Sequence, residues 1–511
     1  MNETGSAPKV LVVGAGPAGL LAASELLRHG VRSRLVERRQ APHKETRGTA
    51  IQPAVLEVLD RAGVVGGFLD AAVHIKQIEL LGPGLKQLAL TELAGLSCKY
   101  EFQCSQPQWR TETILRDRLA SQGLEIEFGV EVMGIEEGGD CLEVTLDKGG
   151  RSEVARPTYL IGAGGAHGVT RHTMQEHLDG ETYTGGYLVA DVKLGVAWPP
   201  RRGRVVVGPN GFVLLSPLPE GRWLIFVNRE VADERAEPPA VADLGALLNA
   251  RIGADVGLND LRWTSYFKMH QRSVPSLSDG RRFLLGDAAH LSSPLGGEGI
   301  NSAFMDAADI AWKLALVIRG AAKPSLLHSY AVERGLADHH ALEVSNEIHT
   351  SIMKLIAMCA HGDPIIEPQD PAHALAGLRR RCMLDVSYAG SSLTGEAGSR
   401  TDKPAPGERY PAWLRLSGAG HQLVVFGQAT GLKEFRARWG ELVTIVEGAG
   451  AGLNAAEAGI LNSGAILVRP DGFIGFRASP ADEAGMKALD AHLATYLEPY
   501  FGAAAHQRVP L

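Results

Sequence analysis

The first stretch that could do chemistry is a glycine-rich turn near the start of the chain, GAGPAG at 14–19. It lies between a short apolar run and an apolar helix pattern, as dinucleotide-binding turns do. Gly14 permits the tight turn, Gly16 lets the backbone approach a pyrophosphate, and Gly19 allows close helix–strand packing. Glu37 follows 18 residues after Gly19, where its carboxylate can accept hydrogen bonds from a ribose 2′-hydroxyl. The stretch therefore predicts a site for FAD or NAD.

A second glycine-rich stretch, GDAAHLSSPLGGEGIN at 286–301, lies between a strand pattern and a long apolar helix pattern. Asp287 at the strand end can accept hydrogen bonds from the hydroxyls of a sugar-like chain. Gly296, Gly297 and Gly299 let backbone N–H groups approach a flat ring. The partial positive charge of the helix start would stabilise an anion on that ring by about 0.5–2 kcal/mol. These features favour a cofactor-binding loop over a capped surface turn.

A third stretch, GAGGAHG at 162–168, also follows a strand pattern and raises the question of a second dinucleotide. Its glycines at 162, 164 and 168 miss the GxGxxG spacing, and no good helix pattern follows. We therefore interpret it as a turn of the cofactor-binding domain without a nucleotide of its own.

The patterns that must position these stretches predict an α/β protein. Residues 9–37 read as strand, helix and strand, and the chain returns to strand, loop and helix at 282–320. Between them, short apolar runs separated by Gly, Pro and Asn turns predict mainly antiparallel sheet. We expect a Rossmann-like cofactor-binding domain formed by 1–75, 107–180 and 276–397, an inserted substrate-binding sheet domain formed by 76–106 and 181–275, and a separate small α/β domain at 398–511.

Composition narrows the class of protein further. The formal net charge of −7 gives no reason to expect a nucleic-acid partner. Five cysteines without a CxxC pair predict neither disulfides nor a metal site, which fits the cytoplasm. The polar residues 1–9 do not resemble a secretory signal, and no apolar run is long enough to span a membrane. We expect a cytoplasmic monomer or homodimer.

The stretches at 14–19 and 286–301 resemble those of the FAD-dependent aromatic hydroxylases, the single-component flavoprotein monooxygenases of the para-hydroxybenzoate, phenol and polyketide hydroxylase type. That family shows GxGPxG, then GDAAHxxxPxGGxGxN and a DAxxLxWKLA helix. This chain has GAGPAG, GDAAHLSSPLGGEGIN and MDAADIAWKLA. Its AILVRPDGFIGFR stretch resembles the end of the thioredoxin-like C-terminal domain of phenol and polyketide hydroxylases, without a CxxC for redox chemistry.

The resemblance implies FAD as cofactor and NADPH or NADH as co-substrate. It also implies that O₂ and the reduced flavin give a C4a-hydroperoxide, whose distal oxygen attacks a small aromatic substrate. It places Asp287 at the ribityl or pyrophosphate part of FAD and Pro294 beside the reactive ring edge. It also places Arg47 on the cofactor and Gln108 near the ribityl chain. The expected cofactor-binding residues are Gly14, Gly16, Pro17, Ala18, Gly19, Glu37, Arg38, Arg47, Gln108, Asp287, Pro294, Gly296, Gly297, Gly299, Ile300 and Asn301.

Two positions depart from the family pattern. Glu298 replaces a glutamine, which would bring negative charge near the flavin and oppose an anionic reduced ring. Gly164 replaces an aspartate that supports the flavin and nicotinamide access, and Gly168 replaces a serine. We expect FAD binding to survive and the use of the nicotinamide to be altered or weak.

The sequence leaves the outcome of the oxygenation open. Hydroxylation is the leading hypothesis. Baeyer–Villiger insertion, or inactivation of a polycyclic antibiotic, would use the same flavin chemistry. A third alternative is a flavoprotein without turnover that acts as a binding protein. The base that activates the substrate is not identified by any motif, and His290 is expected to be structural. Polar candidates on the sheet domain are Tyr183, Tyr187, Asn228, Tyr266 and His270.

Overall fold

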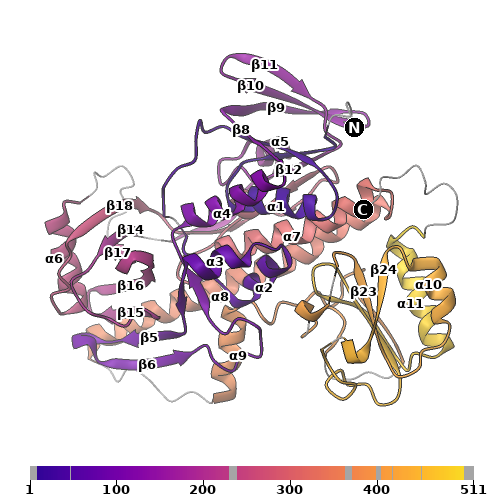
Figure 1. Cartoon of the computed structure of the whole chain (residues 1–511). Helices are drawn as coiled ribbons and strands as arrows, with labels where there is room; N and C mark the ends of the chain where they lie inside the picture. Colours follow the sequence, from indigo (N-terminus) through magenta and orange to yellow (C-terminus); the bar gives the residue numbers. More distant parts are fainter. Residues whose placement is uncertain are drawn as a thin grey trace.

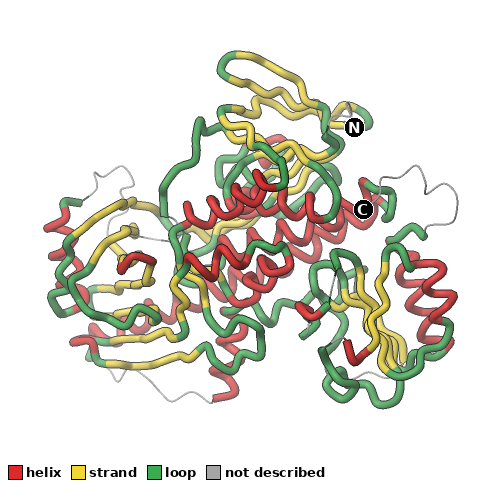
Figure 2. The backbone as a smooth tube through the Cα atoms, in the orientation of Figure 1, coloured by secondary structure: helices red, strands yellow, loops and turns green. Residues whose placement is uncertain are grey.

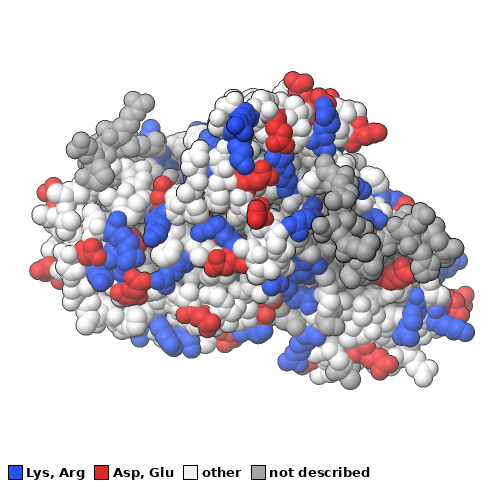
Figure 3. All heavy atoms as spheres, turned by 45° about the horizontal axis from the view of Figure 1, so that its top comes forward, with Lys and Arg blue, Asp and Glu red and all other residues white. Residues whose placement is uncertain are grey.

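The computed structural model describes residues 8–46, 48–183, 185–229, 239–362, 371–398, 404–411, 413–416, 418–450 and 452–499. These residues form a five-stranded parallel sheet, a seven-stranded sheet and a C-terminal sheet, arranged around two long helices (Figures 1 and 2). On the face shown in Figure 3, basic and acidic side chains are interspersed, so charge on that face is locally balanced. In the part of the chain that the structure describes, no helix is long and apolar enough to cross a membrane.

The five-stranded sheet has the order β20-β12-β1-β2-β8, and all its neighbours are parallel. Its strands are β1 (Val10–Val13), β2 (Ser33–Glu37), β8 (Ile126–Phe128), β12 (Tyr159–Gly162) and β20 (Arg282–Leu284). Helix α1 (Pro17–Arg28) joins β1 to β2, which confirms the predicted βαβ unit. Because the strands are parallel, Glu37 and the turns that begin at 14, 162 and 286 all follow carboxyl ends at one edge, where open α/β sheets bind ligands.

Two further helices pack on α1. They are α4 (Gln108–Ser121) and α7 (Gly299–Ile318). α1 places Leu20, Leu21 and Leu26 in the core with no exposed surface, so its apolar face fixes the helix on the sheet.

The seven-stranded sheet has the order β18-β14-β17-β16-β15-β5-β6 and is antiparallel apart from the β15–β5 pair. Its strands are β5 (Gln77–Leu81), β6 (Gln87–Glu92), β14 (Gly186–Lys193), β15 (Arg202–Gly208), β16 (Gly211–Leu218), β17 (Arg222–Arg229) and β18 (Asp260–Phe267). This confirms the predicted, mainly antiparallel sheet. Helix α6 (Val241–Ile252) was not predicted, although Leu244, Leu248 and Ile252 have helical spacing and pack on the sheet.

The two faces of this sheet bury different side chains because residues alternate along each strand. In β14, Leu188 and Ala190 pack toward α6, whereas Tyr187 and Val189 lie on the opposite face with Ile352 of α8 (His328–His361). Leu295 of the 286–301 loop belongs to the same cluster as Tyr187. We call this opposite side the loop-facing side of the sheet.

Three small sheets complete the N-terminal part. They are β9 (Val130–Gly138), β10 (Cys141–Lys148) and β11 (Arg151–Ala155); β3 (Ala50–Ile51), β4 (Val73–Ile75) and β7 (Gln103–Ser105); and β13 (Asp179–Thr182), β19 (His270–Ser273) and β21 (His290–Leu291). The last of them pairs the 286–301 loop with β19. Short helices α2 (Pro53–Arg61), α3 (Val65–Ala71), α5 (Val169–Thr173) and α9 (Pro371–Arg381) lie among the sheets.

The C-terminal unit is a second α/β element that lies beside α7 (Figure 1). Its sheet has the order β22-β26-β25-β23-β24, from β22 (Gly395–Gly398), β23 (His421–Phe426), β24 (Val443–Glu447), β25 (Gly464–Val468) and β26 (Ile474–Ser479). Helices α10 (Leu432–Trp439) and α11 (Glu483–Tyr496) complete it. The last helix, α11, lies within the 481–498 expected from the sequence, whereas β22 begins before the expected start of the unit at 398.

A buried network of charges joins α7 and α8 to this unit. Lys313 of α7 lies 2.5 Å from Asp309 and 2.7 Å from Glu333 of α8. Arg469, which follows β25, lies 2.5 Å from both Glu333 and Asp471. None of these five side chains is more than 5% exposed. Each charge therefore depends on its partners, because none of them has access to water.

Replacing Arg469 by Met should leave Asp471 without its cation and Glu333 with Lys313 alone. We expect a loss of about 3–5 kcal/mol in the free energy of unfolding, measured by urea denaturation at pH 7. The matched control is Arg156→Met, which removes an ion pair with Glu143 whose side chains are 61% and 44% exposed and should cost less than about 1 kcal/mol. Equal losses of unfolding free energy in the two variants would contradict the conclusion that the buried charges depend on Arg469.

Candidate active site

The 14–19 turn has the geometry of a phosphate-binding turn. Gly14 has φ +104°, and a Cβ on Gly19 would lie 1.9 Å from the Gly14 carbonyl oxygen, so both positions require glycine. A Cβ on Gly16 would meet nothing within 4 Å, so the backbone there is open to a ligand. Gly16 precedes α1 without a side-chain cap, and Pro17 begins the helix. The N–H groups of the first turn therefore face an anion site, as expected for a pyrophosphate.

The Glu37 carboxylate lies at the same edge. One oxygen accepts a hydrogen bond from the Ala15 N–H at 2.9 Å and the other accepts from the Arg39 N–H at 3.0 Å. Each oxygen retains a lone pair that a ribose hydroxyl could use. The neighbouring Arg38 is exposed.

The other predicted contacts of the N-terminal part lie around Gly48. A Cβ there would lie 3.6 Å from the Gln108 Oε1 atom and 3.9 Å from the Ile300 Cγ2 atom. The structure thus brings Gln108, at the start of α4, close to the start of α7. The predicted cofactor contact Arg47 lies outside the described residues.

The 286–301 loop presents some of its predicted residues to the surface and buries others. Asp287 and Pro294 are exposed, whereas Asn301 is fully buried. The Asn301 amide donates to the carbonyl oxygens of Ala50 and Gly297 at 2.9 and 2.6 Å and accepts from the Gln52 N–H at 2.8 Å. Asn301 therefore closes the loop onto β3. Gly297 has φ +71°, which allows this turn.

A buried ionic cluster holds the loop, and the sequence singled out one of its members, His290, as a structural residue. Asp306 of α7 accepts from the Gly286 N–H at 3.0 Å and from His290 at 2.9 Å, and Arg334 of α8 donates to it at 2.8 Å. Burial alone would lower the pKa of His290, but Asp338 and Asp306 raise it to about 9, so its imidazole is positively charged. This supports the structural role expected for His290. The aspartate of the DAxxLxWKLA pattern was the available signal.

Glu298 differs from its predicted role. Its carboxyl is 1% exposed, and neither oxygen has a hydrogen-bond partner in the described part of the chain. Burial raises the pKa of Glu298 well above its usual value; Asp385 raises it further, while Arg381 opposes this. The burial and the raised pKa disfavour the negative charge that the sequence suggested at this position, because a sequence does not show how deeply a carboxyl is buried.

The 162–168 turn packs directly on the 14–19 turn. A Cβ on Gly14 would lie 2.4 Å from the Ala163 carbonyl oxygen, and the Ala163 N–H donates to Val13 O at 2.8 Å. Gly164 and Gly168 face each other, since a Cβ on Gly164 would lie 3.3 Å from the Gly168 Cα. The short helix α5 follows, which the sequence did not indicate, and Gly168 gives it no side-chain cap. The 162–168 turn therefore packs against the 14–19 turn and supports its backbone.

The polar candidates of the sheet domain do not form one cluster. Tyr187 stacks on Phe226 at 5.2 Å on the loop-facing side, and burial raises the pKa of Tyr187 to about 12. Asn228 accepts from the Phe212 N–H at 2.8 Å, and His270 pairs with Thr182 at 2.9 Å. Tyr266 packs toward α6, on the other face. Tyr183 lies against His349 of α8, with 4.2 Å between the ring centroids.

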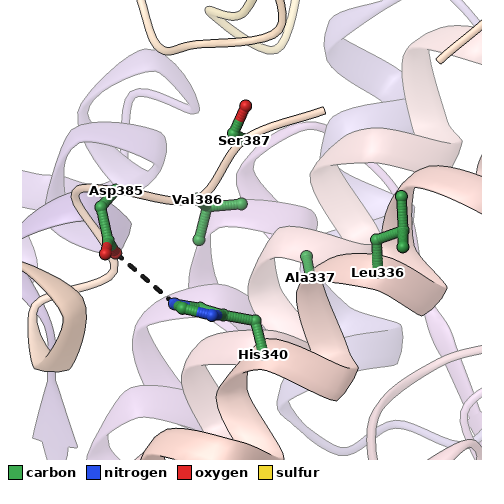
Figure 4. A pocket seen from close by; sticks show the side chains of 6 residues that line it. All are labelled: Leu336, Ala337, His340, Asp385, Val386 and Ser387. Atoms are coloured by element: carbon green, nitrogen blue, oxygen red, sulfur yellow. Dashed lines mark ion pairs between the residues drawn. The ribbon is translucent and has the colours of Figure 1, made fainter. Parts of the chain in front are cut away.

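A cavity of about 170 Å³ lies between α8 and 385–387 (Figure 4). His340 and Asp385 face each other across it at 3.7 Å. It is smaller than the roughly 300 Å³ at which ligand pockets begin. None of its lining residues, Leu336, Ala337, His340, Asp385, Val386 and Ser387, was predicted to bind a cofactor.

Comparison with known families agrees with this geometry. A family model described as an FAD binding domain matches residues 7–345, and one described as the C-terminal part of aromatic-ring hydroxylases matches 403–504. The chain belongs to the FAD-dependent aromatic hydroxylases. FAD is the cofactor of this hydroxylase, and the open turn at Gly16 with the uncapped start of α1 fits its pyrophosphate.

Several relatives that cover most of the chain are named monooxygenases or hydroxylases. The chain is 31% identical to 6-methylpretetramide 4-monooxygenase of Streptomyces rimosus, over 96% of this chain and 94% of that protein. The anhydrotetracycline hydroxylase structure from Streptomyces rimosus matches with a TM-score of 0.78 and 25% identity, covering 96% of this chain and 100% of that one. A complex of aklavinone-11 hydroxylase with FAD and aklavinone shares the fold, with a TM-score of 0.79, 24% identity and coverage of 96% and 99%.

Glu298→Gln should make the hydroxylase more stable, and the difference should grow with pH. Above the usual glutamate pKa, the unfolded chain releases this proton while the folded protein keeps it. The free energy of unfolding therefore falls as pH rises, by up to about 1.4 kcal/mol per pH unit, until the raised pKa is reached. Melting temperatures from pH 5 to 8 test this, with Glu343→Gln, an exposed residue of α8, as the control. A constant difference across that range would contradict the protonated state.

Gly164→Asp should speed the reduction of the bound flavin by NADPH or NADH while FAD affinity stays unchanged. The added carboxylate would restore the group that the family has beside the 14–19 turn. Stopped-flow absorbance gives the reduction rate, and fluorescence titration gives the FAD affinity. Gly168→Ala crowds the same turn without adding charge, because its Cβ would lie 3.1 Å from the Gly165 carbonyl oxygen. Unchanged nicotinamide kinetics in the aspartate variant would refute the expectation.

Proposed function

We propose that this protein hydroxylates a polycyclic phenol, with NADPH or NADH as reductant and O₂ as oxygen donor. The observation that carries the proposal is the contact between the 286–301 loop and the aromatic, loop-facing side of the seven-stranded sheet. Leu295 of that loop lies in one apolar cluster with Phe212, Phe226 and Met269.

The rings of this cluster pack against one another and are wholly or partly buried. Phe226 lies 5.2 Å from Tyr187, 5.3 Å from Phe267 and 5.9 Å from Phe212, measured between ring centroids. An aromatic layer of this kind beside the 286–301 loop would favour a flat aromatic molecule over a small polar one. Relatives that cover most of the chain are named for 6-methylpretetramide, anhydrotetracycline and aklavinone, which are polycyclic.

Different residues would bind the cofactor and exclude water in such a reaction. FAD, when bound, supplies the activation of oxygen. The 14–19 turn and the start of α1 would hold the pyrophosphate, and Glu37 would hold the ribose. Pro294 lies exposed beside the buried Leu295 and would border the reactive ring, while the apolar cluster excludes water from it.

The proposal includes the division into domains expected from the sequence, with 398–511 as a thioredoxin-like unit. The strand order β24-β23-β25-β26, with β23 and β24 parallel and β25 antiparallel to both its neighbours, supports this. The unit has no cysteine, so its role is to pack against α7 rather than to exchange disulfides.

Oxygen consumption with NADPH or NADH, with and without a panel of polycyclic phenols, tests the function. We expect the phenol to accelerate oxidation of the nicotinamide, and the product to contain one atom from oxygen-18 gas by mass spectrometry. An oxygen inserted between ring carbons would identify Baeyer–Villiger chemistry instead. Absence of nicotinamide oxidation with every phenol would refute the proposal.

A further inference from the structure

The side of α8 that packs on the seven-stranded sheet carries several apolar side chains and a buried histidine. Ile348, Ile352, Met353 and Ile356 belong to the loop-facing cluster and recur at helical spacing. His349 lies among them and is 7% exposed. A side chain used only to fill this space would not need to be polar.

The imidazole of His349 has an acceptor without a partner. Its Nδ1 atom is buried and has no hydrogen bond within the described residues. Burial lowers the pKa of His349, which favours the neutral ring, and the neutral tautomer with the proton on Nε2 leaves Nδ1 free to accept. An unsatisfied buried acceptor destabilises the folded protein, so a ligand that donates to it would relieve that cost.

Tyr183 holds this imidazole in place. The two rings lie 4.2 Å apart between centroids, inclined by 38°. The Tyr183 hydroxyl lies 2.7 Å from the Gln271 Oε1 atom and 2.9 Å from the Asn346 Oδ1 atom. Its backbone N–H donates to the Met269 carbonyl oxygen at 3.0 Å. Contacts from α8 and β19 thus fix the ring against which His349 lies.

The same part of α8 contacts the 286–301 loop. The Ser345 hydroxyl, one turn before His349, donates to the Ser293 carbonyl oxygen at 2.9 Å. Ser293 in turn contacts the Met269 sulfur at 3.4 Å. Pro294 and Leu295 follow Ser293 directly, and Leu295 packs with the aromatic residues on the loop-facing side of the sheet. His349 therefore lies near the part of the loop that contacts this side of the sheet.

We propose that His349 binds the substrate by accepting the hydrogen bond of a phenolic hydroxyl at Nδ1, with Tyr183 as its positioning residue. The hydrogen bond draws the phenol proton toward Nδ1 without transferring it, which leaves more electron density on the phenol oxygen and ring. Such a ring is more readily attacked by an electrophilic oxygen. This inference rests on the proposed function, because it assumes a phenolic substrate.

The test compares binding of 2-naphthol and 2-methoxynaphthalene to the FAD-loaded protein, followed through the absorbance of the oxidised flavin. The ether cannot donate a hydrogen bond, so wild type should bind the phenol about 10- to 100-fold more tightly. His349→Phe should lose this preference. His349→Asn keeps an acceptor close to the Nδ1 position and should retain most of it. His339→Phe, at an exposed position of the same helix, should behave as wild type.

Separate results decide the two proposals. Equal preference for the phenol in wild type and in His349→Phe, with FAD content unchanged, would overturn the role of His349 alone. Failure of wild type to bind or oxidise any phenol would overturn the proposed function and this inference with it. If His349→Phe does not load FAD, the comparison of His349→Asn with Tyr183→Phe decides. The proposal requires that His349→Asn keeps the preference for the phenol over the ether and that Tyr183→Phe reduces it. The opposite result would overturn the proposal.

Discussion

Two carboxylates of α7, Asp306 and Asp309, lie buried about one turn apart, and each belongs to an ionic network that reaches a different part of the chain. Asp306 meets His290 of the 286–301 loop and Arg334 of α8, whereas Asp309 meets Lys313, which shares Glu333 with Arg469 of the C-terminal unit. An unpaired buried charge costs several kcal/mol. The cofactor loop, α8 and the C-terminal unit are therefore fixed to one helix.

The sequence predicts the elements whose signal is local. The 14–19 turn, the βαβ unit and the 286–301 loop follow from glycine spacing and apolar periodicity, and the structure has them where expected. Asn301 and Gly297 also lie in this loop, but they bind the loop to itself and to β3. A motif therefore located the site without separating residues that shape it from residues that would touch the cofactor.

What the sequence could not predict depends on contacts between distant segments. Glu298 looks like any carboxylate until the fold buries it, and His349 is one of 17 histidines with no motif around it. Arg469 forms its ion pair with Glu333 only when the C-terminal sheet packs on α7 and α8. Each of these properties depends on burial and on a partner far away in the chain. The local periodicity of apolar residues gives information about neither.

The length of α8 has a consequence for recombination between members of the family. Its 34 residues span about 50 Å, with Glu333 in the second turn and His349 and Ile352 farther along on the sheet. A gene crossover between α8 and the C-terminal unit would take Glu333 and Arg469 from different parents. Such a hybrid keeps its buried charges balanced only where both parents have this pair. The inheritance of a C-terminal unit is therefore linked to that of the helix that borders the substrate surface.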